Sequence, residues 1–274
     1  MRYYFDTVSL RKLSSKLNLY KDKEIYTSSL AILELISGIT EKDYNIRKLA
    51  ISNTLNSNIY IDWDSYKMKM FKAFKIPFND VEGNAIKKMA EYIADSLSFE
   101  DVMQHKIYIG EGEYFTLESF QGLDDDISKI GLDDAQRGIK EWRDELDEEH
   151  RKHINSELFE KKELCAFVRS LSELHFIHFA EDIIGAKRPS EEYLKGLERY
   201  DKSLDLYFYC TQLKFSLSQL KGNQFAKNDT SDLMHTMFML QDDIIVSEDK
   251  IFKHLGEWCN CLTCYNVNEF LDLN

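Results

Sequence analysis

Residues 228–252 read NDTSDLMHTMFMLQDDIIVSEDKIF, and they predict a buried helix, a buried strand and two carboxylates close together in the chain. From Asp232 onward apolar residues recur at helical spacing, and Asp232 is expected in the first helical turn, where a carboxylate suits the helix dipole. Residues 244–246 form a continuous apolar run, typical of a strand buried on both faces of a parallel sheet. Asp249 follows that strand. Because ligands of open α/β sheets bind beyond the carboxyl ends of the strands, we expect Asp249 at a ligand-binding edge.

Two more acids stand in comparable places near the start of the chain. Residues 2–5 are strand-like and run directly into Asp6. Residues 24–27 predict a further strand, and residues 28–36 predict a helix that carries Glu34 next to its apolar side. Since the carboxyl ends of parallel strands meet at one edge of a sheet, these acids are expected to approach Asp249.

Three short blocks contain these acids: FDT at residues 5–7, SSLAILELISG at residues 28–38, and SDLMHTMFML followed by IIVSEDKIF. In order and spacing these blocks resemble PIN-domain nucleases. The family's domain is about half as long as this chain, so the resemblance covers only the two ends. It implies that the family's acidic quartet falls on four residues: Asp6, Glu34, Asp232 and Asp249. Ser247 stands where the family usually has Thr, and it keeps the hydroxyl.

The predicted fold is α/β, a PIN-like three-layer domain with a central parallel sheet and a large α-helical insertion. Helix and strand alternate through the first part of the chain, with a helix over 43–55, a strand over 59–61 that ends in Asp62, and a helix over 64–74. This alternation favours a parallel sheet with right-handed crossovers. We expect residues 1–75 and 190–274 to form the PIN-like domain, and residues 76–189 to form an acidic helical insertion.

The charge of the chain is concentrated in that insertion. The formal net charge is −13, yet 26 Asp and Glu against 14 Lys and Arg lie between Ile76 and Ser190, and 22 acids against 21 bases lie elsewhere. A strongly acidic protein would be an unusual nucleic-acid binder, but the flanking segments are close to neutral. For their bases, such as Lys67, Lys69 and Lys72, a solvated surface is slightly favoured over a phosphate-contacting rim. The insertion is expected to restrict access of RNA.

Clustered carboxylates need a hard cation, and Mg²⁺ or Mn²⁺ prefers oxygen ligands and binds substrate phosphates. We expect Asp6 and Asp249 to hold the principal metal, Asp232 to hold it directly or through water, and Glu34 to position a second ion or a water. Three residues are expected to support the site: Thr7, Ser247 through its hydroxyl, and Asp229 as the N-cap of the helix in which Asp232 is the third residue. His235 faces either the cleft or the helix behind it.

We therefore predict that the protein is a metal-dependent endoribonuclease, which cleaves phosphodiester bonds of single-stranded RNA. RNA is implied by the PIN resemblance, since the metal argument alone does not separate RNA from DNA. One alternative is a catalytically weak or inactive PIN-like scaffold that docks a protein partner or inhibitor through the acidic insertion. Another is a helical interaction module whose acids are only caps and surface groups.

Two further sets of side chains have metal-ligand chemistry: Cys259, Cys261 and Cys264 in a C-x-C-x-x-C cluster, and the pairs His150 with His153 and His175 with His178. Apart from His254 near the cysteines, no further ligand stands at an evident spacing, so ordinary thiols and histidines are favoured. The odd number of cysteines is typical of reduced thiols. No signal peptide or apolar run of roughly 20 residues is visible. We expect a cytoplasmic protein with no membrane partner, and a homo-oligomer is left open.

Overall fold

The computed structural model describes residues 1–110, 112–145, 161–221, 225–258 and 261–273. Within these residues the fold is α/β, built around a parallel sheet whose strand order is β3-β2-β1-β6-β7. The strands are short: β1 (Arg2–Phe5), β2 (Glu24–Ser28), β3 (Tyr60–Asp62), β6 (Ile244–Val246) and β7 (Thr263–Tyr265). The parallel sheet predicted from the alternation of helix and strand is confirmed.

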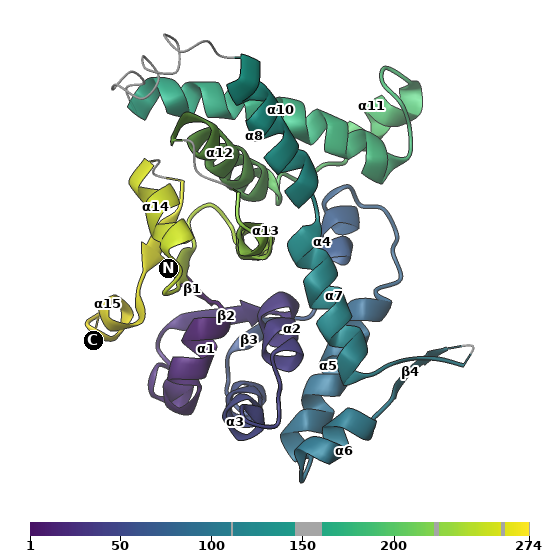
Figure 1. Cartoon of the computed structure of the whole chain (residues 1–274), viewed down its shortest axis with the longest axis vertical. Helices are drawn as coiled ribbons and strands as arrows, with labels where there is room; N and C mark the ends of the chain where they lie inside the picture. Colours follow the sequence, from purple (N-terminus) through teal and green to yellow (C-terminus); the bar gives the residue numbers. More distant parts are fainter. Residues whose placement is uncertain (111, 146–160, 222–224, 259–260, 274) are drawn as a thin grey trace.

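Helices surround this sheet (Figure 1). Outside residues 76–189 they are α1 (Thr7–Leu13), η1 (Ser14–Leu19), α2 (Ser29–Ser37), α3 (Tyr44–Leu55), α4 (Tyr66–Ala73), α11 (Glu191–Glu198), α12 (Asp205–Lys221), α13 (Lys227–Met234), η2 (His235–Phe238), α14 (Lys250–Trp258) and α15 (Val267–Leu271). The elements η1 and η2 are 3-10 helices. None of the helices in the described part of the chain has the length and apolar character needed to cross a bilayer.

Strand β1 occupies the centre of the sheet and pairs with β2 on one side and β6 on the other. Its alternating side chains face opposite sides of the sheet. Tyr3 and Phe5 meet the ring of Phe270 of α15, with ring centroids 5.2 and 5.1 Å apart. Tyr4 points the other way, toward the ring of His235 of η2. The sheet is therefore covered on both faces.

The register of the strands aligns their carboxyl ends. Phe5 of β1 pairs with Val246 of β6, so Asp6 and Ser247 leave the sheet together. Ser28, the last residue of β2, lies opposite Asp62 of β3. The residues that follow the central strands thus gather at one edge, as the sequence predicts.

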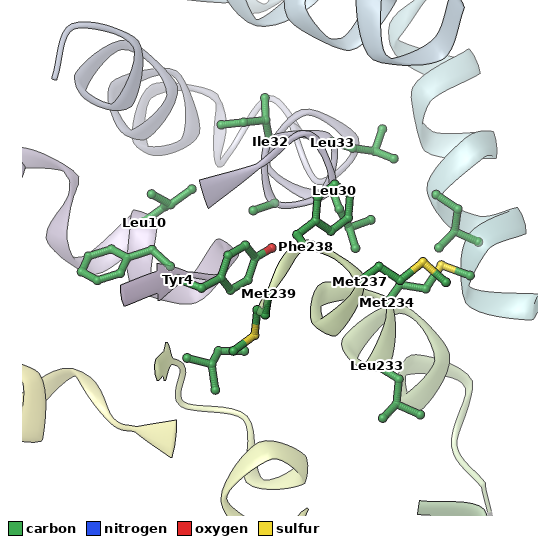
Figure 2. Packing of buried hydrophobic residues seen from close by; sticks show 14 of the residues in the cluster. Tyr4, Leu10, Leu30, Ile32, Leu33, Leu233, Met234, Met237, Phe238 and Met239 are labelled. Carbon is green, nitrogen blue, oxygen red and sulfur yellow. The ribbon is translucent and has the colours of Figure 1, made fainter. Parts of the chain in front are cut away.

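Helix α2 begins at this edge and is buried on almost every side. Ser28 caps its N-terminus, since the Ser28 side chain accepts a hydrogen bond from the backbone N–H of Ala31. All of its residues except Glu34 and Ser37 are buried, although the sequence suggested a single apolar face. A helix that is apolar all round is a core helix. Figure 2 shows Leu30 of α2 near Phe238 of η2 in the packed layer beside Tyr4.

Residues 76–189 share this core. Their described elements are α5 (Val81–Asp95), α6 (Phe99–Gln104), β4 (Ile107–Gly110), β5 (Glu113–Phe115), α7 (Leu117–Lys129), α8 (Leu132–Glu145) and α10 (Lys161–Ile184). Helix α5 packs on α2 and α3, α7 packs on α2 and α13, and α10 packs on α12. Figure 1 shows α8 and α10 gathered with α12 above the sheet. The insertion therefore contacts both α2 and α13 through α7.

Two details differ from the elements that the sequence predicts. The insertion is not purely helical, because β4 and β5 form an antiparallel hairpin, and Gly110 and Gly112 next to its turn have positive φ angles. The apolar spacing of residues 191–220 is typical of one long helix, but they form two helices, α11 and α12. The break lies where Lys202 has a φ of 67° and the backbone N–H of Ser203 donates to the Asp201 side chain. The sequence also predicts helices around residues 133–154 and over 158–184, and of these segments residues 146–160 lie outside the described residues.

Candidate active site

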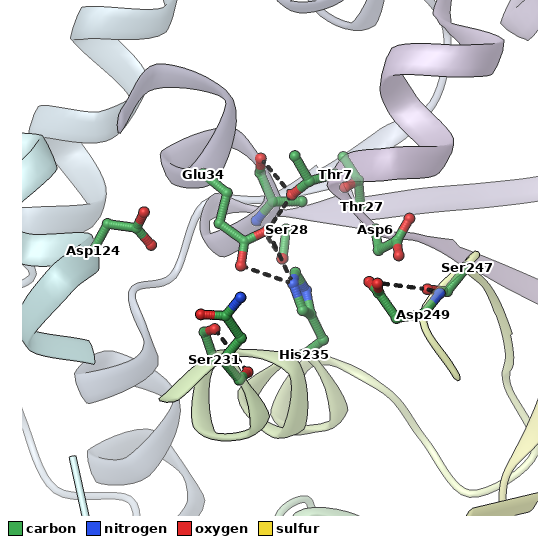
Figure 3. A network of polar contacts seen from close by, with 12 residues as sticks. Asp6, Thr7, Thr27, Ser28, Glu34, Asp124, Ser231, His235, Ser247 and Asp249 are labelled. Atoms are coloured by element: carbon green, nitrogen blue, oxygen red, sulfur yellow. Dashed lines mark hydrogen bonds and ion pairs between the residues drawn. The ribbon is translucent and has the colours of Figure 1, made fainter. Parts of the chain in front are cut away.

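Asp6 and Asp249 lie at the carboxyl ends of adjacent strands. Asp6 follows β1 and caps α1, because its Oδ1 accepts a hydrogen bond of 2.8 Å from the backbone N–H of Ser9. Asp249 follows β6, and its backbone N–H donates to Ser247 Oγ over 3.0 Å. Ser247 Oγ also lies 3.5 Å from Asp249 Oδ2, and Figure 3 shows Asp6 next to this pair. Ser247 therefore lies beside both carboxylates.

Burial raises the pKa of both carboxyls above the ordinary value. For Asp6, which is only 2% exposed, the Ser247 hydroxyl and the backbone N–H of Ser9 oppose this effect. For Asp249 the charge of His235 opposes it. Oδ2 of Asp6 is buried and has no hydrogen-bond partner among the described residues. Such an atom is costly to keep unless a ligand satisfies it.

Glu34 projects from α2 toward the same region. The Thr7 hydroxyl donates to its Oε2, and Nε2 of His235 lies 3.3 Å from each carboxylate oxygen. Figure 3 shows Glu34 held between these two side chains. Burial acts to raise the pKa of Glu34, but the His235 charge and the hydrogen bonds from His235 and Thr7 outweigh it and lower the pKa. Glu34 is thus an ionised carboxylate with a fixed orientation.

Asp232 lies on α13, but not in its first turn. The helix begins at Lys227, so Asp232 is the sixth of eight helical residues and gains nothing from the positive end of the dipole. Burial, together with the charges of Asp249 and Glu34 and against the charge of His235, raises its pKa to about 8. The charges of Glu34, Asp6 and Asp232 all act on His235, and the charge of Asp249 acts on Asp232, so the four predicted acids are linked electrostatically through these neighbours.

The expectation that Asp229 is the N-cap is wrong. The N-cap residue of α13 is Ala226, and Asp229 is the third helical residue, whose Oδ2 accepts a hydrogen bond of 2.7 Å from the Ala226 backbone N–H. The same oxygen lies 3.0 Å from Nζ of Lys214 on α12. The reason is that the helix starts one turn earlier than its apolar pattern. Asp229 therefore anchors α13 to α12.

His235 is the residue whose role the sequence left open. It is 2% exposed, and its Nδ1 lies 2.6 Å from the hydroxyl of Tyr4. Burial favours the neutral ring, but the negative charges of Glu34 and Asp6 outweigh burial and raise the His235 pKa to about 9. The spacing of three residues from Asp232 was the only signal in the sequence, and it allowed two directions. The ring faces the acids.

Asp124 brings a further carboxylate to the site from α7 of the insertion. Its Oδ2 accepts a hydrogen bond of 2.6 Å from the hydroxyl of Ser37, at the end of α2. Burial raises the Asp124 pKa, and the charge of Glu34 acts in the same direction. Figure 3 shows Asp124 directed from α7 toward Glu34. Its neighbour Asp125 instead forms exposed ion pairs with Lys129 and Lys227.

Several bases outside the insertion are engaged with acids. Lys69 lies 2.9 Å from Asp62, and Lys72 lies 2.7 Å from Asp64. Lys67 pairs with Glu82 of α5. Asp62, the acid at the end of β3, is therefore an ion-pair partner. These contacts agree with a solvated, paired surface for these lysines.

The donor set of the site fits a hard cation. Asp6, Glu34, Asp232 and Asp249 offer carboxylate oxygens, which Mg²⁺ and Mn²⁺ prefer, and Oδ2 of Asp6 is an orphaned acceptor among the described residues. No three His, Cys, Asp or Glu side chains among residues described by the structure already stand close enough together to form a metal-ligand group. Oxygen ligands on four separate segments nevertheless match the chemistry of such an ion.

The other candidate ligands have different surroundings. Cys259 and the pair His150 and His153 lie outside the described residues. His175 packs edge-on against Phe208, with ring centroids 5.4 Å apart, and His178 lies 3.9 Å from Glu181. The acidic cluster at the sheet edge is thus the site with the most developed chemistry in the described structure.

Compared with known proteins, the chain matches no protein-family model, no curated protein and no solved structure.

Proposed function

We propose that the chain is a PIN-like, metal-dependent endoribonuclease that hydrolyses phosphodiester bonds of single-stranded RNA. One observation carries the proposal: Asp6 and Asp249 follow adjacent parallel strands at their carboxyl edge, where α/β proteins bind their ligands, and the charges of Glu34 and Asp232 act on the same group of residues. RNA as substrate and a cytoplasmic location rest on the sequence arguments, and the parallel sheet is compatible with both ends forming one PIN-like domain.

The cost of keeping these acids together supports a cation as the missing partner. The pKa of Asp6, Asp232 and Asp249 is raised in each case by burial, so the folded chain disfavours their ionised forms. A divalent cation removes this penalty by neutralising the carboxylates. Mg²⁺ or Mn²⁺ would be held by Asp6 and Asp249, with Asp232 and Glu34 completing the set. When bound, such ions orient and ionise a water and stabilise the leaving oxygen.

Hydrogen bonds with neighbouring residues restrain the acids. Ser247 holds the loop of Asp249 through the hydrogen bond from the Asp249 backbone N–H. Thr7 donates to Glu34 and thereby fixes one of its oxygens. Asp6 is held by the backbone of Ser9 at the start of α1. Carboxylates restrained in this way need little reorganisation when substrate phosphate and metal bind.

A second candidate function is supported by Asp124. This acid of the insertion lies beside Glu34 and adds negative charge where an RNA phosphate would approach. The charge would repel RNA in the absence of sufficient metal. On this alternative, the chain is a catalytically weak PIN-like scaffold whose acidic insertion docks a protein partner or inhibitor.

Cleavage of labelled single-stranded RNA with Mg²⁺, with Mn²⁺ and with chelator tests the proposal. Asp6→Asn should abolish cleavage, because the amide keeps the cap on α1 but removes the charge. Asp22→Asn, a change at an exposed acid away from the site, is the matched control. A single-stranded DNA of the same sequence tests the choice of RNA. Full activity of Asp6→Asn, or metal-independent cleavage by the parent, would refute the proposal, and absence of cleavage by the parent with either metal would favour the scaffold.

A further inference from the structure

The buried histidine of the site belongs to a chain of hydrogen-bonded side chains. Nε2 of His235 lies 3.3 Å from both carboxylate oxygens of Glu34, and Nδ1 lies 2.6 Å from the Tyr4 hydroxyl. That hydroxyl lies 2.6 Å from Ser28 Oγ. Tyr4 and Ser28 are fully buried. Both ring nitrogens of His235 are therefore engaged by the protein itself, so the ring is held between β1, the end of β2 and α2.

We propose that His235 is a positioning residue, which holds the carboxylate of Glu34 toward the acidic cluster, and that Tyr4 and Ser28 fix the plane of the imidazole. The inference rests on the proposed function only in assigning Glu34 a part in cleavage. His235 itself is not expected to touch the reacting atoms. Its action passes through Glu34.

The geometry explains why Glu34 needs such a partner. A Glu side chain loses on the order of 1.5–2 kcal/mol of rotamer entropy when it is fixed. The Thr7 hydroxyl restrains only Oε2, which leaves the carboxylate plane free to turn about that contact. His235 reaches both oxygens from another direction, as Figure 3 shows. Contacts from α1 and η2 thus fix the orientation of the Glu34 carboxylate, and Tyr4 of β1 orients the His235 ring.

The two nitrogens of the ring allow a matched pair of substitutions. The amide of Gln reaches about as far as Nε2, so His235→Gln can keep a donor near Glu34 while losing the contact with Tyr4. The amide of Asn stands near Nδ1, so His235→Asn can keep the contact with Tyr4 while losing Glu34. Loss of a partner that orients an active carboxylate costs about 10–100-fold in activity or metal affinity. His235→Asn should show this loss, and His235→Gln should lose about tenfold less.

A second pair separates positioning from stability. Tyr4→Phe and Tyr26→Phe each remove a buried hydroxyl from neighbouring rings, whose centroids are 5.3 Å apart. The Tyr26 hydroxyl donates to Asp243, at the opposite edge of the sheet from Asp6. Both variants should lose comparable stability. Only Tyr4→Phe should lower kcat, with KM changed by about twofold or less, because the affected group acts after substrate is bound.

The deciding experiment combines crystal structures of the parent chain, His235→Asn and His235→Gln with their RNA cleavage and Mn²⁺ titrations. The proposal expects the Glu34 carboxylate to move in His235→Asn, to stay in His235→Gln, and kcat to follow that order. An unmoved Glu34 in His235→Asn, or a kcat loss for Tyr26→Phe equal to that for Tyr4→Phe, would overturn it. If the parent cleaves no RNA, the proposed function fails, and the position of Glu34 in the variant structures still decides the inference.

Discussion

Replacing Asp232 by Asn should stabilise the metal-free protein while abolishing cleavage. The carboxyl of Asp232 titrates near 3.8 when unfolded, and burial raises its folded pKa to about 8. Between those values the folded chain holds a proton that the unfolded chain releases, so stability falls as pH rises across that window. At pH 7 the shifted pKa of Asp232 therefore lowers the free energy of unfolding by on the order of 4 kcal/mol, at about 1.36 kcal/mol per pH unit. Asn needs no proton.

The expected gain for Asp232→Asn is on the order of 2–4 kcal/mol, because an amide reproduces only part of the hydrogen bonding of the protonated acid. For a chain of this size, that gain corresponds to a rise of roughly 5–15 °C in Tm. Thermal unfolding with chelator, from pH 5 to pH 8, measures it directly. The parent should lose Tm across this range more steeply than Asp232→Asn.

Asp229→Asn provides the matched control three residues away. It weakens the contact with Lys214, which is 18% exposed, and should cost about 1–3 kcal/mol. At a temperature where the variant is folded, cleavage should persist, because the part of Asp229 is to anchor α13 to α12 and not to hold the metal. The reasoning is refuted if Asp232→Asn is less stable than the parent without metal, or if Asp229→Asn loses cleavage while Asp232→Asn keeps it.

Three further predictions concern groups away from the acids. Asp243→Ala should lower stability by about 2–4 kcal/mol in thermal unfolding and leave kcat unchanged, because it removes the buried partner of Arg2 at the opposite edge of the sheet. Burial, with the charge of His178, lowers the pKa of His175, so stability should fall as pH drops below about 6.5. Between pH 7.5 and 5.5, the Tm of His175→Gln should therefore fall less than the Tm of His178→Gln. Burial raises the Cys264 pKa to about 12, so mass spectrometry should find its alkylation at pH 8 orders of magnitude slower in the folded chain than after unfolding.

Continuous apolar runs made the central strands predictable. Residues 2–5 and 244–246 are buried on both faces, and their positions match the expected ones. Strand β7, with the sequence TCY, is exposed or only half-buried and has no comparable apolar pattern. It was missed because edge strands receive their stability from pairing with a neighbour.

The positions of the acids could be predicted more easily than their surroundings. Asp6 and Asp249 follow strands, so their place depends on the sheet alone. Asp229 was misassigned because α13 begins at Lys227 without a capping side chain, and an acid that caps a helix looks the same in sequence as one that bonds back from the third position. Asp124 belongs to a distant helix, and only the packing of α7 on α2 brings it near Glu34.

The central position of β1 has a consequence for synthesis on the ribosome. β1 is made before its neighbour β6, which follows more than 200 residues later. At translation rates of about 5–20 residues per second, the nascent chain waits roughly 10–50 s with one edge of β1 unpaired. Unpaired strand edges invite aggregation, so this chain should depend on protection by chaperones during that interval. The same delay keeps Asp6 apart from Asp249 until the residues after β6 have emerged, so no nascent chain that ends before residue 249 can assemble the acidic cluster.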